Sequence, residues 1–155
     1  MTAIHRRVEA LREGRDPTLI ERLSSGWAVF GERQFLRGYC LLLPDPVVPH
    51  LNDFDSLARA QFLADMAALG DALLAETGAL RINYAMFGNM EPALHAHLVP
   101  RYADEKAPLD VAHPWAYDWA VAPAFDPVTF EPLRAALRRR LSPLLRSAEA
   151  GPSST

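Results

Sequence analysis

Alternating apolar and polar positions stand out in one segment of the chain, residues 93–100. Apolar side chains fill every second position from Leu94 to Leu98, and His95 and His97 occupy the other phase. Alternation over this length predicts a half-buried strand, whose side chains two positions apart share a face at a spacing of roughly 6.5–7 Å. The pattern therefore predicts that two imidazoles project together from one face of a sheet.

Three more segments have the composition of strands. Residues 27–30 and 35–43 are apolar and are separated by the hairpin-like turn 31–34, and residues 81–87 form a third run. The second run ends at Pro44, because proline cannot donate a hydrogen bond to a neighbouring strand. We expect these three strands and the histidine-bearing strand to form one antiparallel sheet.

Helical spacing of apolar residues predicts one long helix, residues 56–77. Asp55 is suited to cap its N-terminus, and Gly78 is suited to end it. Its predicted buried stripe consists of Leu57, Leu63, Met66, Ala67, Leu73 and Leu74.

Shorter helices are predicted near both ends of the chain. Residues 2–13 carry an apolar stripe, and Asp16 and Pro17 suit the start of a second helix that runs to Leu23. Thr129 suits the cap of a last helix. The predicted buried stripe of that helix consists of Leu133, Leu137, Leu141 and Leu144.

Strands gathered around one long helix predict an α+β domain. The long helix packs on a central antiparallel sheet, and the terminal helices are additions to this core. A length of 155 residues, half of them apolar, suits a single domain, to which we assign residues 1–150. Residues 103–127 contain four prolines and two tryptophans and predict an ordered loop, whereas residues 151–155 predict a disordered tail.

Charge and cysteine content exclude several classes of protein. The net charge of −3 gives no overall basic field for nucleic acid. The single cysteine, Cys40, excludes an internal disulfide and favours a reducing compartment. No apolar run approaches the roughly 20 residues of a membrane span, and the first residues lack the apolar core of a signal peptide. We therefore expect a cytoplasmic protein that binds neither nucleic acid nor membrane.

The paired histidines allow three interpretations. Imidazole is the side chain best able to act as a nucleophile or proton carrier near neutral pH, but a strand histidine is often structural. A metal site needs a third protein ligand, and the remaining histidines, His5, His50 and His113, do not lie at ligand spacing. We therefore predict no metal. We expect His95 and His97 to share one solvent-accessible cleft.

Two segments resemble the histidine-triad family. The run from Gly88 to Arg101, GNMEPALHAHLVPR, is similar to the family signature His-φ-His-φ-His-φ-φ, where φ is apolar. The run from Gly38 to Pro44, GYCLLLP, is similar to the upstream strand of that family. The long predicted helix falls between the two segments, as in the family. The resemblance covers roughly residues 26–101 and implies a histidine-triad-like fold.

The chain departs from the family pattern at two positions. Ala93 stands where the signature has its first histidine, and Tyr39 stands where the upstream strand has another. The resemblance implies that His95 is the nucleophile, oriented by the main-chain carbonyl of Ala93, and that His97 contacts phosphate. The chain also resembles the diadenosine polyphosphate hydrolases, in which glutamine is familiar at the first position, whereas alanine, as in this chain, is less so.

The resemblance implies a nucleotide phosphohydrolase or nucleotidyl transferase without a cofactor. Its substrates would be dinucleoside polyphosphates or nucleoside phosphoramidates, cleaved through a nucleotidyl-histidine intermediate. Asn89, at the rim of the expected cleft, Asn83 and Tyr39 are the candidate nucleotide-binding residues. The family usually forms homodimers, so a homodimer is expected. One alternative is a catalytically weakened nucleotide-binding protein of the same fold. The other is a small interaction protein whose histidines are structural.

Overall fold

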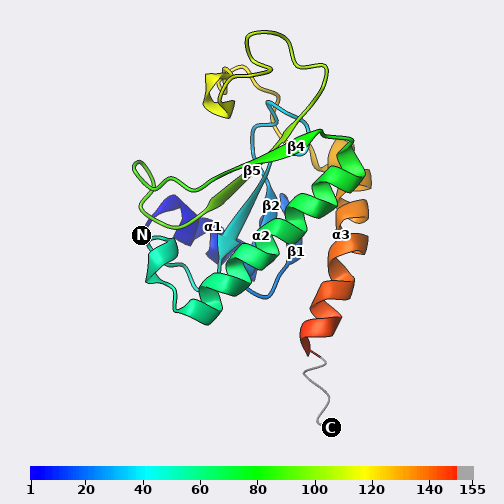
Figure 1. Cartoon of the computed structure of the whole chain (residues 1–155). Helices are drawn as coiled ribbons and strands as arrows, with labels where there is room; N and C mark the ends of the chain where they lie inside the picture. Colours follow the sequence, from blue (N-terminus) through cyan, green and yellow to red (C-terminus); the bar gives the residue numbers. More distant parts are fainter. Residues whose placement is uncertain (150–155) are drawn as a thin grey trace.

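A five-stranded antiparallel sheet forms the centre of the protein in a computed structural model that describes residues 1–149 (Figure 1). The spatial order of the strands is β1-β2-β3-β5-β4, and every neighbouring pair is antiparallel. The strands are β1 (Leu19–Arg22), β2 (Gly26–Phe30), β3 (Cys40–Pro44), β4 (Arg81–Ala85) and β5 (Ala96–Arg101). This arrangement confirms the predicted α+β fold class.

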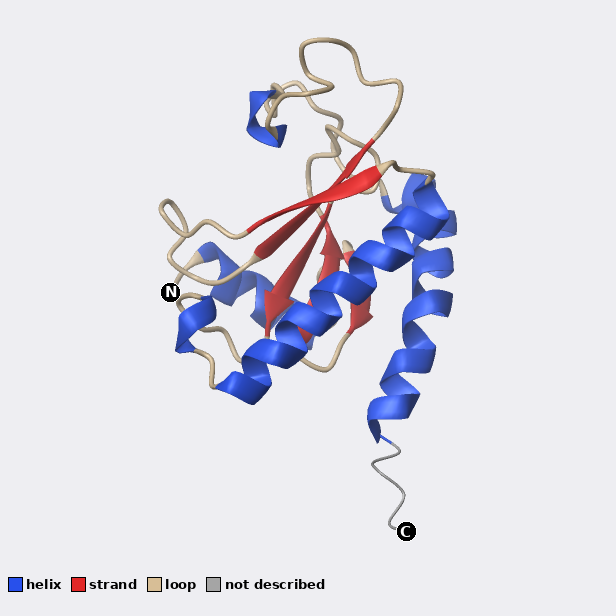
Figure 2. Ribbon diagram, viewed as in Figure 1, coloured by secondary structure: helices blue, strands red, loops and turns tan. Residues whose placement is uncertain are grey.

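Helices cover both faces of the sheet (Figure 2). The helices α2 (Ser56–Thr77) and α3 (Pro127–Glu149) lie side by side on one face, where they bury the larger part of the core. The shorter helix α1 (Ala3–Arg12) packs on the opposite face. Strand β5 divides its side chains between these layers, with Leu98 facing α2 and α3 and Val99 facing α1.

The long helix α2 has the predicted bounds, but its buried face differs from the prediction. The Asp55 carboxylate accepts a hydrogen bond from the backbone of Ala58 at 2.8 Å, and Gly78 ends the helix in the left-handed conformation. Leu57 and Leu63 are exposed. The buried face consists of Phe62, Asp65, Leu69, Gly70, Ala72 and Leu73. Leu73 of the predicted stripe is buried and Met66 packs against the core, but the spacing of apolar residues did not indicate the buried carboxylate of Asp65.

Asp65 is buried because its carboxylate has partners. It accepts hydrogen bonds from the backbone and the hydroxyl of Ser25, at 2.8 and 2.7 Å. These bonds fasten α2 to the turn between β1 and β2, and they compensate for the loss of water around the charge.

The last helix begins two residues before the predicted cap. The Asp126 carboxylate accepts a hydrogen bond from the backbone of Thr129 at 2.8 Å, so Asp126 takes the capping role that we had assigned to Thr129. Of the predicted stripe, Leu144 is 51% exposed. The other three members, Leu133, Leu137 and Leu141, are buried against α2 and the sheet.

The short helix predicted up to Leu23 is wrong, because those residues form the edge strand β1. The Asp16 carboxylate accepts hydrogen bonds from the backbone and the hydroxyl of Thr18 and closes a turn there. The chain then pairs with β2 and buries Ile20 completely. Pairing with a neighbour decides the conformation of such a short segment more strongly than its local sequence does.

Three strands are shorter than predicted. β3 starts at Cys40 instead of residue 35, because the Gln34 side chain bonds the backbone of Gly31, Gly38 and Tyr39 and holds the preceding residues in a turn. β4 ends two residues early, and the regular pairing of β5 begins at Ala96. The alternation of faces nevertheless extends back to residue 93.

Two short 3-10 helices complete the fold, η1 (Leu51–Asp53) and η2 (Pro114–Ala116). The second lies within the predicted loop 103–127, which projects from one end of the sheet (Figure 1). Within residues 1–149, no helix combines the length and apolar character needed to span a bilayer. The predicted disordered tail, residues 151–155, lies outside the described residues.

Candidate functional site

The two histidines lie together on the sheet face that α1 covers, as the alternation predicts. The centroids of the His95 and His97 rings are 4.8 Å apart, and the ring planes cross at 71°. The neighbouring residues Leu94, Ala96 and Leu98 pack into the opposite core, beneath α2 and α3. The strand therefore anchors itself with one set of side chains and presents the imidazoles with the other.

His95 is oriented by the backbone of its own segment. Its Nδ1 lies 2.8 Å from the carbonyl oxygen of Ala93. A carbonyl oxygen can only accept a hydrogen bond, so Nδ1 carries the proton. In the neutral ring, the lone pair is then on Nε2. The replacement of the first signature histidine by Ala93 leaves this backbone interaction in place.

Both imidazoles are less open than the sequence led us to expect. His95 is only 8% exposed, and its one hydrogen bond goes to the backbone. Within the described residues, however, the fully buried side-chain nitrogens that lack a partner are only Trp119 Nε1 and Arg134 Nε. Because the Nε2 atoms of His95 and His97 have no partner either, both atoms remain accessible.

His97 is held by a tyrosine that directly precedes the neighbouring strand β3. The hydroxyl of Tyr39 lies 2.7 Å from Nδ1 of His97, and the two rings are nearly parallel. Burial, assisted by the positive charge that His95 can carry, lowers the pKa of His97 to about 4. His97 is therefore neutral at physiological pH. Burial also raises the pKa of Tyr39, so its hydroxyl keeps its proton.

A glycine makes room for the Tyr39 ring. A Cβ atom at Gly31 would lie 2.1 Å from two carbon atoms of that ring, closer than any real contact. Tyr39 itself is 3% exposed and packs against Phe35 and Trp119. The packing of Gly31, Phe35 and Trp119 against the ring therefore holds the hydroxyl beside His97.

An aromatic cover from the loop 103–127 lies over the histidines. Trp115 packs edge-on against His97, with ring centroids 5.0 Å apart, and also contacts Phe87 and His113. Trp119 packs against Tyr39. From the sequence we predicted an ordered loop here and assigned none of its residues to the site. The only local signal of its role is the pair of tryptophans in an otherwise irregular segment.

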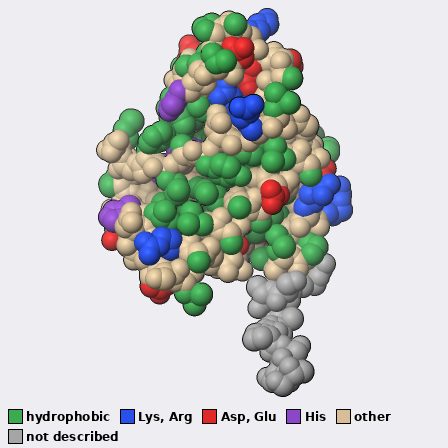
Figure 3. Space-filling model, viewed as in Figure 1, with side chains coloured by type: hydrophobic (Ala, Val, Ile, Leu, Met, Phe, Trp, Pro, Cys, Tyr) green, Lys and Arg blue, Asp and Glu red, His purple; other side chains and the backbone are tan. Residues whose placement is uncertain are grey.

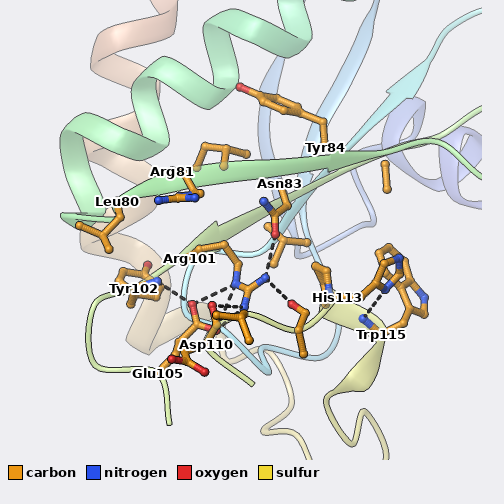
Figure 4. Close-up of a pocket in the computed structure, with 16 residues that line it drawn as sticks. Leu80, Arg81, Asn83, Tyr84, Arg101, Tyr102, Glu105, Asp110, His113 and Trp115 are labelled. Atoms are coloured by element: carbon orange, nitrogen blue, oxygen red, sulfur yellow. Dashed lines mark hydrogen bonds and ion pairs between the residues drawn. The ribbon is translucent and has the colours of Figure 1, made fainter. Parts of the chain in front are cut away.

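A buried arginine fastens this loop to the sheet (Figure 4). Arg101, at the end of β5, pairs with Glu105 at 2.8 Å and donates hydrogen bonds to the carbonyl oxygens of Ala112 and Leu109. Glu105 also accepts a hydrogen bond from the Tyr117 hydroxyl. Burial opposes the charge on Glu105, yet these bonds hold the pKa of its carboxyl below the usual value. The ion pair between Arg101 and Glu105 thus connects the loop to the end of β5.

The candidate residue Asn83 belongs to the same network. Its side-chain oxygen accepts a hydrogen bond from Arg101 at 2.8 Å. Asn83 pairs with Val99, two residues along the strands from the pairing of Ala85 with His97. Its carbonyl group is therefore committed to Arg101, and its amide nitrogen is the part left for a ligand.

The candidate residue Asn89 lies in the exposed turn that precedes the histidines. Its side chain makes no hydrogen bond within the part of the chain that the structure describes. Glu91, two residues later, accepts a hydrogen bond from the backbone of Ile4 at 3.2 Å and so ties this turn to the start of α1. Asn89 is exposed and free to meet a ligand, and within the described residues it forms no hydrogen bond with either imidazole.

Two cavities lie near the histidines, but neither is walled by His95 or His97, so the single cleft that we predicted around both imidazoles is not present in the described part of the chain. The first, of about 840 Å³, is walled by Asn83, Arg101, His113 and Trp115 (Figure 4). The second, of about 770 Å³, is walled by residues of α1 and by Thr18, Glu32, Tyr39, Leu41 and Trp119. His97 contacts Trp115 of the first wall and Tyr39 of the second. In residues 1–149, no three or more histidine, cysteine, aspartate or glutamate side chains gather to hold a metal ion.

Comparison with known proteins identifies the fold. No family model matches the sequence, and no curated protein matches it. A histidine triad protein from Bradyrhizobium japonicum superposes with a TM-score of 0.69 at 25% identity, over 84% of this chain and 94% of that one. One from Marinobacter aquaeolei has a TM-score of 0.72 at 20% identity, over 93% and 98%. A hypothetical histidine triad nucleotide-binding protein from Sulfolobus tokodaii has a TM-score of 0.68 at 12% identity, over 88% and 91%. The chain therefore has the histidine-triad-like fold.

Proposed function

We propose that the protein is a nucleotide hydrolase or nucleotidyl transferase that uses His95 as its nucleophile. The observation that carries the proposal is the 2.8 Å bond from His95 Nδ1 to the carbonyl oxygen of Ala93, which leaves an accessible lone pair on Nε2. A neutral imidazole in this state is a competent nucleophile toward phosphorus.

The reaction has two steps. In the first, a bond forms between His95 Nε2 and the α-phosphorus, and the bond from that phosphorus to the leaving group breaks. The ring becomes positively charged, and the Ala93 carbonyl oxygen stabilises that charge through the Nδ1 proton. In the second step, a water oxygen bonds to phosphorus as the phosphorus–nitrogen bond breaks, and the water proton passes to solvent. The product is a nucleoside monophosphate.

His97 is the candidate contact for the phosphate oxygens, because its ring lies 4.8 Å from that of His95. Asn89 and the free amide nitrogen of Asn83 are further candidates for the leaving group. The cavity beside Tyr39 and α1 has a volume of about 770 Å³, which is enough for a nucleoside. Histidine triad neighbours, one of them described as nucleotide-binding, support nucleotides as the ligand class.

Within this class, we propose dinucleoside polyphosphates or nucleoside phosphoramidates as substrates. Both consist of a nucleoside monophosphate joined to a leaving group. The two cavities, whose walls include the Trp115 and Tyr39 rings that contact His97, would receive the two parts of such a molecule.

A catalytically weakened nucleotide-binding protein is the second candidate. Three observations favour it: alanine at position 93, tyrosine at position 39, and the nearly complete burial of His95. The aromatic cover would then have to exclude water from a bound nucleotide without assisting its cleavage.

A panel assay separates the two candidates. The purified chain is incubated with dinucleoside polyphosphates and nucleoside phosphoramidates, and the products are identified by chromatography. The same compounds are tested in a thermal-shift assay. Turnover in the native chain and its loss in His95→Asn would support the hydrolase. A nucleotide-dependent thermal shift without turnover would support the binding protein, and neither signal would exclude both.

We also propose a homodimer. β4 is an edge strand of the sheet, and α2 exposes Leu57 and Leu63. Hydrophobic side chains gather over α2 on the face shown in Figure 3. An apolar helix face beside an open strand edge is suited to pairing with a second copy of the chain.

A further inference from the structure

The hydroxyl of Tyr39 has a single partner in the described part of the chain, Nδ1 of His97. The tyrosine is 3% exposed, so water cannot replace a missing hydrogen bond at low cost. A phenol has one proton to donate. Since no other acceptor lies within reach of this hydroxyl, its proton must point toward His97.

The direction of this bond determines the state of His97. If Nδ1 carried a proton, it would donate to the phenol oxygen, and the hydroxyl proton of Tyr39 would be left without an acceptor in a buried position. Nδ1 must therefore accept. A neutral imidazole has one ring proton, which then resides on Nε2.

We propose that Tyr39 is a positioning residue that fixes His97 in the tautomer with a protonated Nε2, and that it acts on the ligand only through that histidine. The proposal deepens the proposed function, on which its kinetic consequence rests. It also changes the role expected for Tyr39. Instead of contacting the nucleotide, the Tyr39 hydroxyl donates a hydrogen bond to His97, which contacts the nucleotide.

The consequence is a pair of imidazoles in opposite states. His95 donates from Nδ1 to Ala93 and exposes a lone pair on Nε2, whereas His97 accepts at Nδ1 and exposes an N–H group on Nε2. The first can attack phosphorus, and the second can donate to a phosphate oxygen. If Nε2 of His97 were also unprotonated, its lone pair would face the negatively charged phosphate oxygen and repel it.

The packing of Tyr39 makes this assignment stable. The planes of the Tyr39 and His97 rings are nearly parallel, with an interplanar angle of 8°. Gly31 removes the side chain that would displace the tyrosine ring. Because burial raises the pKa of the phenol, Tyr39 holds its proton and donates a hydrogen bond without transferring it.

The direct test is nuclear magnetic resonance of the ligand-free protein with ¹⁵N-labelled histidine rings at neutral pH. Long-range proton–nitrogen correlations distinguish the two tautomers, and the His97→Ala variant assigns the signals. We expect a protonated Nε2 and a bare Nδ1 for His97, and the reverse for His95. A protonated Nδ1 on His97 in the native chain would overturn the proposal.

The variant Tyr39→Phe removes only the hydroxyl, and Tyr84→Phe is its matched control. Tyr84 lies on β4, and its hydroxyl packs against Gly70 of α2, on the other face of the sheet. In Tyr39→Phe, His97 should become a mixture of tautomers while His95 stays unchanged; Tyr84→Phe should leave both unchanged. An unaltered His97 tautomer in a folded Tyr39→Phe protein would contradict the inference.

If Tyr39→Phe does not fold, the Tyr39 hydroxyl proton in the native chain provides the second measurement. It should show a correlation across the hydrogen bond to Nδ1 of His97, and a correlation to any other acceptor would contradict the proposal.

Kinetics supplies a readout that a purely structural role would not give. Once a substrate is known, Tyr39→Phe should lower kcat by about tenfold, the effect of one hydrogen bond, with a smaller change in KM. If Tyr39→Phe instead raised KM about tenfold and left kcat unchanged, Tyr39 would bind the ligand directly. The tautomer spectra need no substrate, so a failure of the proposed function leaves their result intact.

Discussion

Arg101 fastens the aromatic cover to the sheet, and its replacement tests how the cover is held. Its guanidinium is 9% exposed and its partner Glu105 is 3% exposed. In addition to this pair, the guanidinium bonds the side chain of Asn83 and two backbone carbonyls of the loop. The variant Arg101→Met keeps a similar length of side chain but removes all these bonds.

The expected cost is about 3–5 kcal/mol of unfolding free energy, the usual effect of removing one partner from a buried ion pair. Most of it arises because the Glu105 carboxylate would stay buried without its counter-charge. The loop can relieve this by detaching and exposing Glu105 to water, so we expect a value near the lower limit. Detachment would also expose Trp115 and Trp119.

Urea unfolding followed by circular dichroism and by tryptophan fluorescence measures both effects. Arg81→Met is the matched control, because Arg81 pairs with Arg101 across the two strands but is exposed and has no ion pair within residues 1–149. The double variant Arg101→Met/Glu105→Gln should lose less than the sum of the single losses. A loss below about 1 kcal/mol in Arg101→Met, or strict additivity, would refute the buried pair as the fastening of the loop.

Three further predictions follow from the site. The pKa of His97, at about 4 in the folded state against an ordinary 6.5, means that the unfolded chain binds more protons between these values. Stability should therefore fall as the pH drops through this window, and a flat response, or an NMR titration of His97 near 6.5, would contradict its burial. Ala93→His should destabilise by about 1–3 kcal/mol in urea unfolding, because Ala93 is completely buried; a neutral effect would mean that the core beneath α1 can yield. Sedimentation should give twice the mass of 17.2 kDa, and Leu63→Lys should return it to the monomer value; a native monomer would exclude the proposed dimer.

Local signals were sufficient for much of the fold. The bounds of α2 follow from Asp55 and Gly78, each of which acts within one turn of the helix. The two faces of β5 follow from its alternation. By contrast, the assignment of Leu23 and its predecessors to a helix was wrong, because β1 exists only through its pairing with β2.

The site shows the same division between local and distant interactions. The pairing of His95 with His97, and the carbonyl of Ala93, could be predicted because all three lie within five residues. The bond from Tyr39 to His97 joins residues 58 positions apart. The packing of Trp115 on His97 depends on the Arg101 network, which no periodicity reveals. The aromatic cover could therefore not be predicted, whereas His95, His97, the Ala93 carbonyl and, in another role, Tyr39 were named from the sequence as candidates.

The central claim is that His95 Nε2 attacks phosphorus, and rapid-quench intact-mass spectrometry tests it most directly. The native chain is mixed briefly with a substrate from the panel assay, quenched, weighed and then mapped by peptide digestion. We predict an added mass of one nucleotidyl group located on His95, and none in His95→Asn, with circular dichroism confirming that the variant is folded. An adduct on another residue, or undiminished turnover in His95→Asn, would contradict the account.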